Sequence, residues 1–204
     1  MGEWRELART VPGTLLRVAE GTIGLLGTLG SAHRKLGAFI RVVGSLQRGG
    51  GSGDAISWDD VREQPNAGAA LDDARRELVR LRELHSMASV VFVLCGGRAR
   101  LAPNPEADPR WQAWAGHRGE TSGHGSRALQ SLRAAASHVR ASRDALLMAR
   151  SLPRRSTDRA AWVAAAMNLW RRAIWATTEA MLAARRMRDA VTVELEDAWM
   201  VLNR

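Results

Sequence analysis

The sequence is poor in several residue types that define particular protein classes. A single cysteine, Cys95, in 204 residues excludes a disulfide framework, a cysteine-based zinc site and an iron–sulfur cluster. No run of about 20 uncharged apolar residues occurs, which excludes an ordinary transmembrane helix. Tyrosine is absent and Lys35 is the only lysine. Arginine therefore supplies nearly all of the positive charge.

Arginine dominates the charged residues that are present. The 30 basic residues exceed the 21 acidic ones and give a formal charge of +9. The excess is concentrated in residues 1–48 and 127–155, whereas residues 49–72 are acidic. Guanidinium groups bind phosphate in a bidentate geometry, so lipid headgroups and nucleic acids are both candidate partners. With 46% hydrophobic residues, the chain also has enough apolar material for a folded core.

The spacing of apolar residues predicts an all-α fold without strands. Apolar side chains recur three or four residues apart, which places them on one helix face. The pattern predicts main helices over 3–48, 70–95, 126–151 and 158–202. The expected architecture is four main amphipathic helices in an elongated antiparallel bundle with long loops.

Glycine and proline predict how the chain is divided. We expect an N-terminal amphipathic helical region (1–48), a flexible acidic Gly-rich linker (49–69) and a helical bundle region (70–204). Glycine is a poor helix former, so Pro12-Gly13 and the glycines between 21 and 30 predict a bend or break in the first helix.

Two further local patterns concern the middle of the chain and the last helix. Residues 96–125 are rich in Gly, Pro and His and predict a loop, with a short helix at 109–115 that presents Trp111 and Trp114. Gly96-Gly97 predict the end of the second helix. Ser156 or Thr157 is expected to cap the last helix.

The run Val90-Val91-Phe92-Val93-Leu94 is apolar on every side. Such a segment is expected to be buried in protein or in lipid. The run could also form a strand, because the periodicity of so short a segment does not distinguish a strand from a helix.

No catalytic constellation is recognisable, so we expect a protein that is not an enzyme and that needs no cofactor. Nucleophile and dinucleotide motifs are absent. His117 and His124 fall in the predicted loop with Glu120 between them, but their spacing matches no zinc pattern, and solvated loop histidines are expected. Cys95, near an apolar helix end, is expected to be a small buried residue.

Residues 31–48 form the candidate binding segment. On a helix, Leu36, Phe39, Ile40, Val43 and Leu46 make one apolar stripe, and Arg34, Arg41 and Arg48 recur every seven residues on another face beside Lys35. A helix of this kind can lie in an anionic membrane surface with its apolar face in the acyl layer. The alternative is an ordinary helix that faces a protein core and has a solvated basic side.

Several short motifs resemble the peroxin-11 family of helical peroxisomal membrane proteins. They are Arg34-Lys35-Leu36, Val42-Val43 and Gln47, then Phe92, Cys95 and Trp111, then Ser131-Leu132 with Arg143-Asp144, and finally residues 195–203. The chain departs from the family in lacking tyrosine and a glycine-rich hydrophobic segment near its C-terminus. The resemblance implies a peroxisomal membrane location, membrane elongation before fission, self-association and partners in a fission machinery.

Two other function classes stay open. The first is a soluble cytoplasmic adaptor or structural subunit, with Trp162, Trp170, Trp175 and Trp199 in its core or interface. The second is nucleic-acid binding through arginines of the third helix, at positions 133, 140, 143 and 150. No recognised nucleic-acid motif accompanies these arginines, which disfavours the second class.

Overall fold

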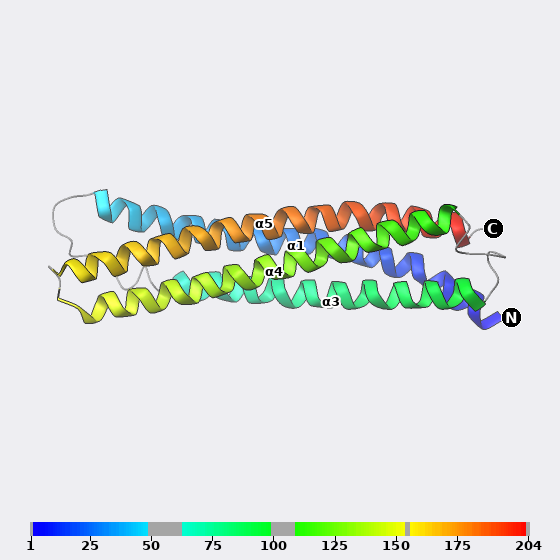
Figure 1. Ribbon diagram of the computed structural model, residues 1–204, viewed down its shortest axis with the longest axis horizontal. Coiled ribbons are helices and arrows are strands. Elements are labelled where there is room, and N and C mark those ends of the chain that lie inside the picture. Colours follow the sequence, from blue (N-terminus) through cyan, green and yellow to red (C-terminus); the bar gives the residue numbers. More distant parts are fainter. Residues whose placement is uncertain (1, 49–62, 99–108, 154–155, 203–204) are drawn as a thin grey trace. The chain divides into compact units, whose positions relative to one another are not determined.

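The computed structural model describes residues 2–48, 63–98, 109–153 and 156–202. They form four α-helices: α1 (Gly2–Arg48), α3 (Glu63–Arg98), α4 (Pro109–Ser151) and α5 (Thr157–Leu202), shown in Figure 1. No strand occurs among these residues. The predicted all-α class is therefore confirmed.

Each helix buries side chains at alternating intervals of three and four residues. A repeat of seven residues keeps one stripe of side chains turned toward neighbouring helices, as in coiled coils and four-helix bundles. In α1 the stripe is Ala8, Val11, Leu15, Val18, Thr22, Leu25, Leu29, Ala32, Leu36 and Phe39. In α3 it is Ala67, Leu71, Ala74, Leu78, Leu81, His85, Ala88 and Phe92.

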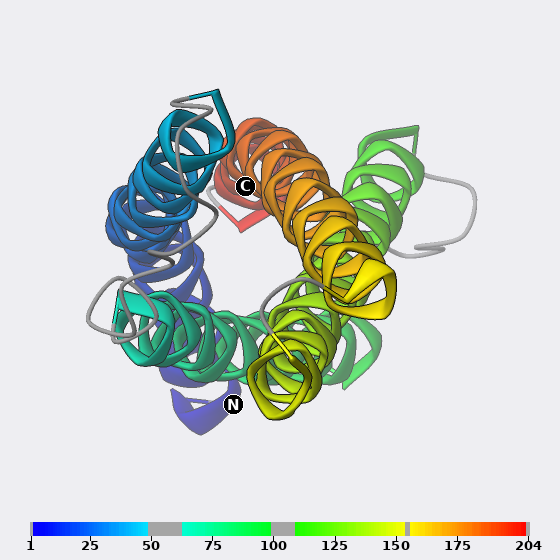
Figure 2. The ribbon, with the colours of Figure 1, turned by 90° about the vertical axis from the view of Figure 1, so that its left-hand side faces the viewer.

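The chain forms two compact units, and each unit contains a segment of all four helices. Unit 1 comprises Met1–Leu26, Arg76–Ala128 and Leu182–Arg204, and unit 2 comprises Gly27–Arg75 and Leu129–Met181. Within each unit, segments of consecutive helices run in opposite directions (Figure 1). Figure 2 shows the segments of unit 2 end-on around a shared core. This division differs from the three consecutive regions expected from the sequence.

The core of unit 2 joins α1 to α5 and α4 to α5. The Phe39 and Trp170 rings lie with their centroids 4.2 Å apart, and the Trp170 indole donates a hydrogen bond to the backbone oxygen of Leu36. The buried hydroxyl of Ser142 on α4 donates to the backbone oxygen of Ala166 on α5. Alanines make up half of the buried residues of α5, so neighbouring helices can approach its backbone closely at these positions.

The core of unit 1 contains an aromatic cluster. Phe92 on α3 packs against Trp111 and Trp114 on α4, with centroid distances of 4.9 and 4.0 Å. Phe92 and Trp114 are fully buried, whereas Trp111 is half-buried. The cluster fixes the end of α3 against the beginning of α4.

The predicted break in α1 does not occur. The helix continues through Pro12 and through every glycine between 21 and 30. A proline inside a helix costs about 3 kcal/mol. Burial of Val11, Leu15 and Val18 stabilises the same turns by roughly 1.5–3 kcal/mol each, which outweighs the local preference.

The predicted linker and the ends of the second helix also need correction. Residues 63–69 are the first two turns of α3, and the helix continues through Gly96-Gly97 to Arg98. Proline is tolerated at position 65, because a first-turn residue has no intrahelical partner for its N–H group. Burial of Ala67 in unit 2 stabilises these additional turns of α3. Residues 49–62 of the predicted linker lie outside the described residues.

The loop predicted over 96–125 is wrong for residues 116–125, whereas the short helix predicted at 109–115 is confirmed. Both segments are helical and continuous with the rest of α4. Gly125 has a packing role that composition does not reveal, since a Cβ atom there would lie 3.2 Å from Cγ of Arg82 and 3.3 Å from Sδ of Met187. Contacts with other helices therefore override the low helix propensity of the glycines.

The last helix agrees with prediction to within one residue. Ser156 supplies the N-cap, as its hydroxyl oxygen accepts a hydrogen bond from the backbone N–H of Asp158. Asp158 also places a negative charge in the first turn, where the helix dipole favours it.

Candidate functional site

The predicted membrane-binding residues of α1 divide between the core and the surface of unit 2. Leu36 is fully buried and Phe39 is 4% exposed. Ile40 is half-buried, whereas Arg34, Lys35 and Arg41 are exposed. The side chains of Val43, Leu46 and Arg48 lie outside the described residues.

The apolar stripe of residues 31–48 thus faces protein wherever its side chains are described. Phe39 packs on Trp170, and the backbone of Leu36 accepts the indole hydrogen bond. Membrane insertion of this stripe stays a prediction, and it requires α1 to separate from α5. The arginines expected to contact nucleic acid, at 133, 140, 143 and 150, are exposed on α4.

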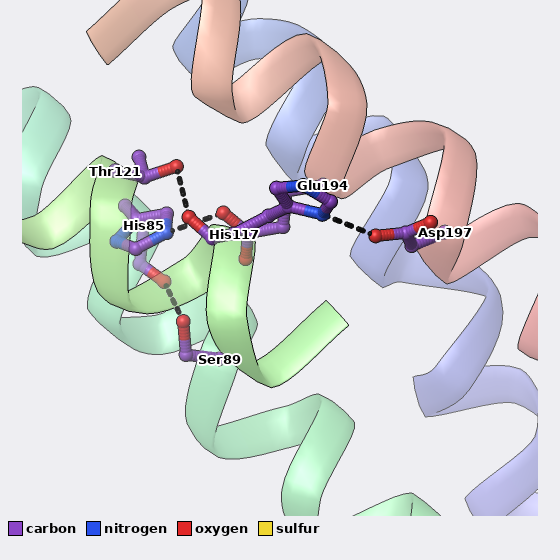
Figure 3. A network of polar contacts seen from close by, with 6 residues as sticks. All are labelled: His85, Ser89, His117, Thr121, Glu194 and Asp197. Carbon is purple, nitrogen blue, oxygen red and sulfur yellow. Dashed lines mark hydrogen bonds and ion pairs between the residues drawn. The ribbon is translucent and has the colours of Figure 1, made fainter. Parts of the chain in front are cut away.

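A polar network occupies the interior of unit 1, where the heptad pattern calls for apolar side chains (Figure 3). Nε2 of His85 on α3 lies 2.8 Å from Oε2 of Glu194 on α5. Nδ1 of His117 on α4 lies 2.7 Å from Oδ2 of Asp197 on α5. Two histidine–carboxylate pairs therefore link three helices.

Hydroxyl groups of the network bind the backbone rather than the imidazoles. Ser89 donates to the backbone oxygen of His85 at 2.8 Å, and Thr121 donates to that of His117 at 3.0 Å (Figure 3). Each hydroxyl lies one helical turn after its histidine. Neither hydroxyl is paired with an imidazole in the way that a serine nucleophile is paired with its base.

Burial distinguishes the two pairs. The side chains of His85 and Glu194 are 6% and 0% exposed, whereas that of His117 is 33% exposed. Oε1 of Glu194 has no hydrogen-bond partner among the described residues. His85 is therefore the hydrogen-bond partner on which the buried Glu194 carboxyl depends.

A cavity of about 370 Å³ adjoins this network between α3 and α4. Its polar lining includes Arg82, Arg118, His85 and four hydroxyl residues, and Met187 of α5 closes part of it. No carboxylate belongs to the described lining. The cavity therefore combines positive charge with hydroxyl groups.

The fold lowers the pKa of His124 on α4. Burial and the neighbouring cations Arg127 and Arg186 lower its pKa from the ordinary value of 6.5, and Glu120 opposes this shift. Nδ1 of His124 is buried without a partner among the described residues. The predicted picture of solvated loop histidines is wrong for His117 and His124, because both lie on a helix and His117 binds Asp197.

The apolar run of α3 is only partly buried in protein. Phe92 enters the core, but Val90, Val93 and Leu94 are 52%, 42% and 44% exposed, and Met87 is 61% exposed. The three- and four-residue spacings place these four side chains on one outward face of the helix. We call Met87, Val90, Val93 and Leu94 the α3 stripe. The α3 stripe is therefore an exposed apolar surface of unit 1.

Two kinds of site are not found among the described residues. No group of three or more His, Cys, Asp and Glu side chains is placed to hold a metal ion. In the four described helices, no 18-residue segment has the hydropathy and low charge of a membrane span.

Comparison of the chain with protein-family models, with curated proteins and with solved structures finds no match. Function is therefore inferred from the residues themselves.

Proposed function

We propose that the protein is a non-enzymatic helical protein that binds an anionic membrane surface through the α3 stripe of unit 1. The observation that carries this proposal is the exposure of four large aliphatic side chains on one face of a helix. The proposal keeps the membrane partner expected from the sequence and moves the contact from α1 to α3.

The size and surroundings of the α3 stripe support a shallow insertion. Fully burying an exposed Val, Leu or Met side chain contributes roughly 1.5–3 kcal/mol. The four residues of the α3 stripe are about half exposed, so each can contribute about half of that on insertion. An interfacial helix buries its apolar face about 5–10 Å into the headgroup and acyl boundary. The half-buried Trp111 lies beside Phe92 at the same helix end, and indole rings favour the interface.

Electrostatics favour an anionic surface. The formal charge of the chain is +9, and each Arg near an anionic leaflet contributes about 1 kcal/mol. Glu83 is the last charged residue of α3 before Arg98, so no carboxylate of this segment opposes insertion. The attraction is expected to weaken at high salt.

Membrane elongation at a peroxisomal membrane is the consequence that the peroxin-11-like motifs suggest. A wedge in one leaflet favours positive curvature, and self-association of bound copies would extend it. This part of the proposal is supported by short sequence motifs alone.

Co-sedimentation with vesicles of phosphatidylcholine, with and without phosphatidylserine, tests the proposal. The variant Val90→Asp/Leu94→Asp changes exposed side chains and should keep its helix content while losing binding at least tenfold. The control variant Leu147→Asp/Met148→Asp changes two exposed residues of α4 in unit 2 and should bind like the wild type. Equal binding by the wild type and the α3 variant would contradict the proposal.

A soluble adaptor that self-associates is the second candidate, favoured by Trp175. This residue is 67% exposed on α5, and Trp is enriched among the residues that dominate protein interfaces. The sequence predicts that the four tryptophans of α5 lie in a core or an interface. Among them, only Trp170 is buried in the core of the described structure. Sedimentation velocity without lipid distinguishes this candidate: Trp175→Ala should then convert an oligomer to a monomer.

A further inference from the structure

We propose that the cavity between α3 and α4 in unit 1 binds a phosphate-type oxyanion. The cavity has about the volume of a small-ligand site. Arg82 and Arg118 contribute two guanidinium groups to its lining, and Ser86, Ser89, Thr121 and Ser122 contribute hydroxyls. Guanidinium and hydroxyl donors are the groups that recognise phosphate oxygens.

Contacts outside the cavity hold both arginines in place. Nη2 of Arg82 donates to the Ser126 hydroxyl at 3.1 Å, and its side chain lies against Gly125. The Arg118 guanidinium lies over the Trp114 ring, 5.6 Å from its centroid. Neither arginine pairs with a carboxylate in the part of the chain that the structure describes. Their remaining N–H groups are therefore available to a ligand.

Small residues keep the cavity open on the α4 side. Ala115 and Gly119 belong to its lining, and a Cβ atom built at Gly119 would meet nothing within 4 Å. A side chain longer than alanine at position 119 would therefore start from open space and occupy part of the cavity that a ligand needs.

His85 acts as a positioning residue for this site. Its Nε2 is engaged by Glu194, which fixes the imidazole at the cavity wall. Glu194 itself does not line the cavity. The imidazole of His85, rather than the Glu194 carboxyl, therefore borders the proposed ligand site.

Titration of the full chain with inorganic phosphate, followed by amide chemical shifts in NMR spectra, tests the site. Saturable shifts are expected at Ser86, Ser89 and Gly119. Arg82→Gln and Gly119→Leu should each weaken phosphate binding at least about tenfold, because one removes a charged donor and the other fills the space. Shifts that do not saturate would overturn the proposal.

Two matched controls separate a built site from general charge attraction. Arg80→Gln removes an exposed cation of α3, and Gly116→Leu enlarges a position of α4 where a Cβ atom also meets nothing within 4 Å; neither residue lines the cavity. Both controls should bind phosphate like the wild type. If Arg80→Gln weakens binding as much as Arg82→Gln, the proposal is wrong.

The phosphate group could belong to a soluble molecule or to a lipid headgroup, and vesicles containing phosphatidic acid distinguish the two. A lipid source predicts that Gly119→Leu weakens both phosphate and vesicle binding. A soluble source predicts that it weakens phosphate binding alone. The site does not depend on the proposed function, since Val90→Asp/Leu94→Asp should abolish vesicle binding and leave phosphate binding intact.

Discussion

Removing His85 should destabilise unit 1 more than any surface substitution, because it strands a buried carboxyl group. The Glu194 side chain has no solvent exposure, and its second oxygen already lacks a partner among the described residues. Breaking one member of a buried pair typically costs about 3–5 kcal/mol. We therefore expect His85→Leu to lower the free energy of unfolding by about this amount.

The companion substitutions complete a thermodynamic cycle. Glu194→Met leaves Nε2 of the buried His85 without its hydrogen-bond partner and should cost about 1–3 kcal/mol. The double variant His85→Leu/Glu194→Met removes both polar groups and replaces them with apolar atoms of similar volume. Replacing a buried polar pair by apolar side chains often leaves the free energy of unfolding unchanged. The double variant should therefore be more stable than His85→Leu alone.

Urea unfolding followed by far-UV circular dichroism measures the cycle. For a chain of this length, a loss of 3–5 kcal/mol corresponds to a fall in Tm of roughly 6–20 °C. His138→Leu, a change at a half-buried histidine of unit 2, is the control and should have a smaller effect. A cost below about 1 kcal/mol for His85→Leu, or a double variant whose cost equals the sum of the singles, would refute the reasoning.

Three further predictions concern packing and pH. Gly13→Ala should raise the free energy of unfolding by about 0.5–1 kcal/mol, because its Cβ atom would meet no atom within 4 Å. Gly21→Ala should lower the free energy of unfolding, because its Cβ atom would overlap the side chain of the core residue Leu81. Urea unfolding measures both changes. Phe39→Ala should cost about 3–5 kcal/mol in the same assay, and a surface residue would cost far less. The lowered pKa of His124 means that the folded state binds fewer protons than the unfolded state just below pH 6.5. Stability should therefore fall as the pH drops below 6.5, and His124→Gln should reduce this slope in Tm measurements.

The buried faces of the helices were largely predictable because their apolar residues repeat with one period. In α1, Leu15, Val18, Leu25 and Leu29 follow the three- and four-residue spacing and are buried. Leu7 is exposed, and the neighbouring Ala8 takes the core position instead. The seven-residue repeat decides between them, and a small alanine is easily overlooked beside a leucine.

Residues 116–125 of α4 were not predictable from local preference. Four glycines between 116 and 125 favour a loop when only neighbouring residues are considered. The structure shows contacts that composition cannot express, among them the approach of Arg82 and Met187 to Gly125. Tertiary packing determines the helix there.

The polar network was missed for a related reason. His85 and Glu194 are 109 residues apart in the sequence, and His117 and Asp197 are 80 residues apart. Neither pair forms a local motif. The available signal was a histidine at a position of α3 where the heptad repeat requires an apolar residue, since a buried polar side chain needs a partner.

The location of the apolar stripes determines how membrane binding can be tested. Replacing Phe39 by Asp would remove a core contact with Trp170, so loss of vesicle binding by that variant would report unfolding of unit 2 as readily as a lost membrane contact. Val90 and Leu94 are free of this ambiguity because their side chains are about half exposed. The sequence required the apolar run of α3 to be covered by protein or lipid, and the structure covers Phe92 while leaving the α3 stripe open. Substitutions in the α3 stripe, rather than in the buried face of α1, therefore test the membrane hypothesis.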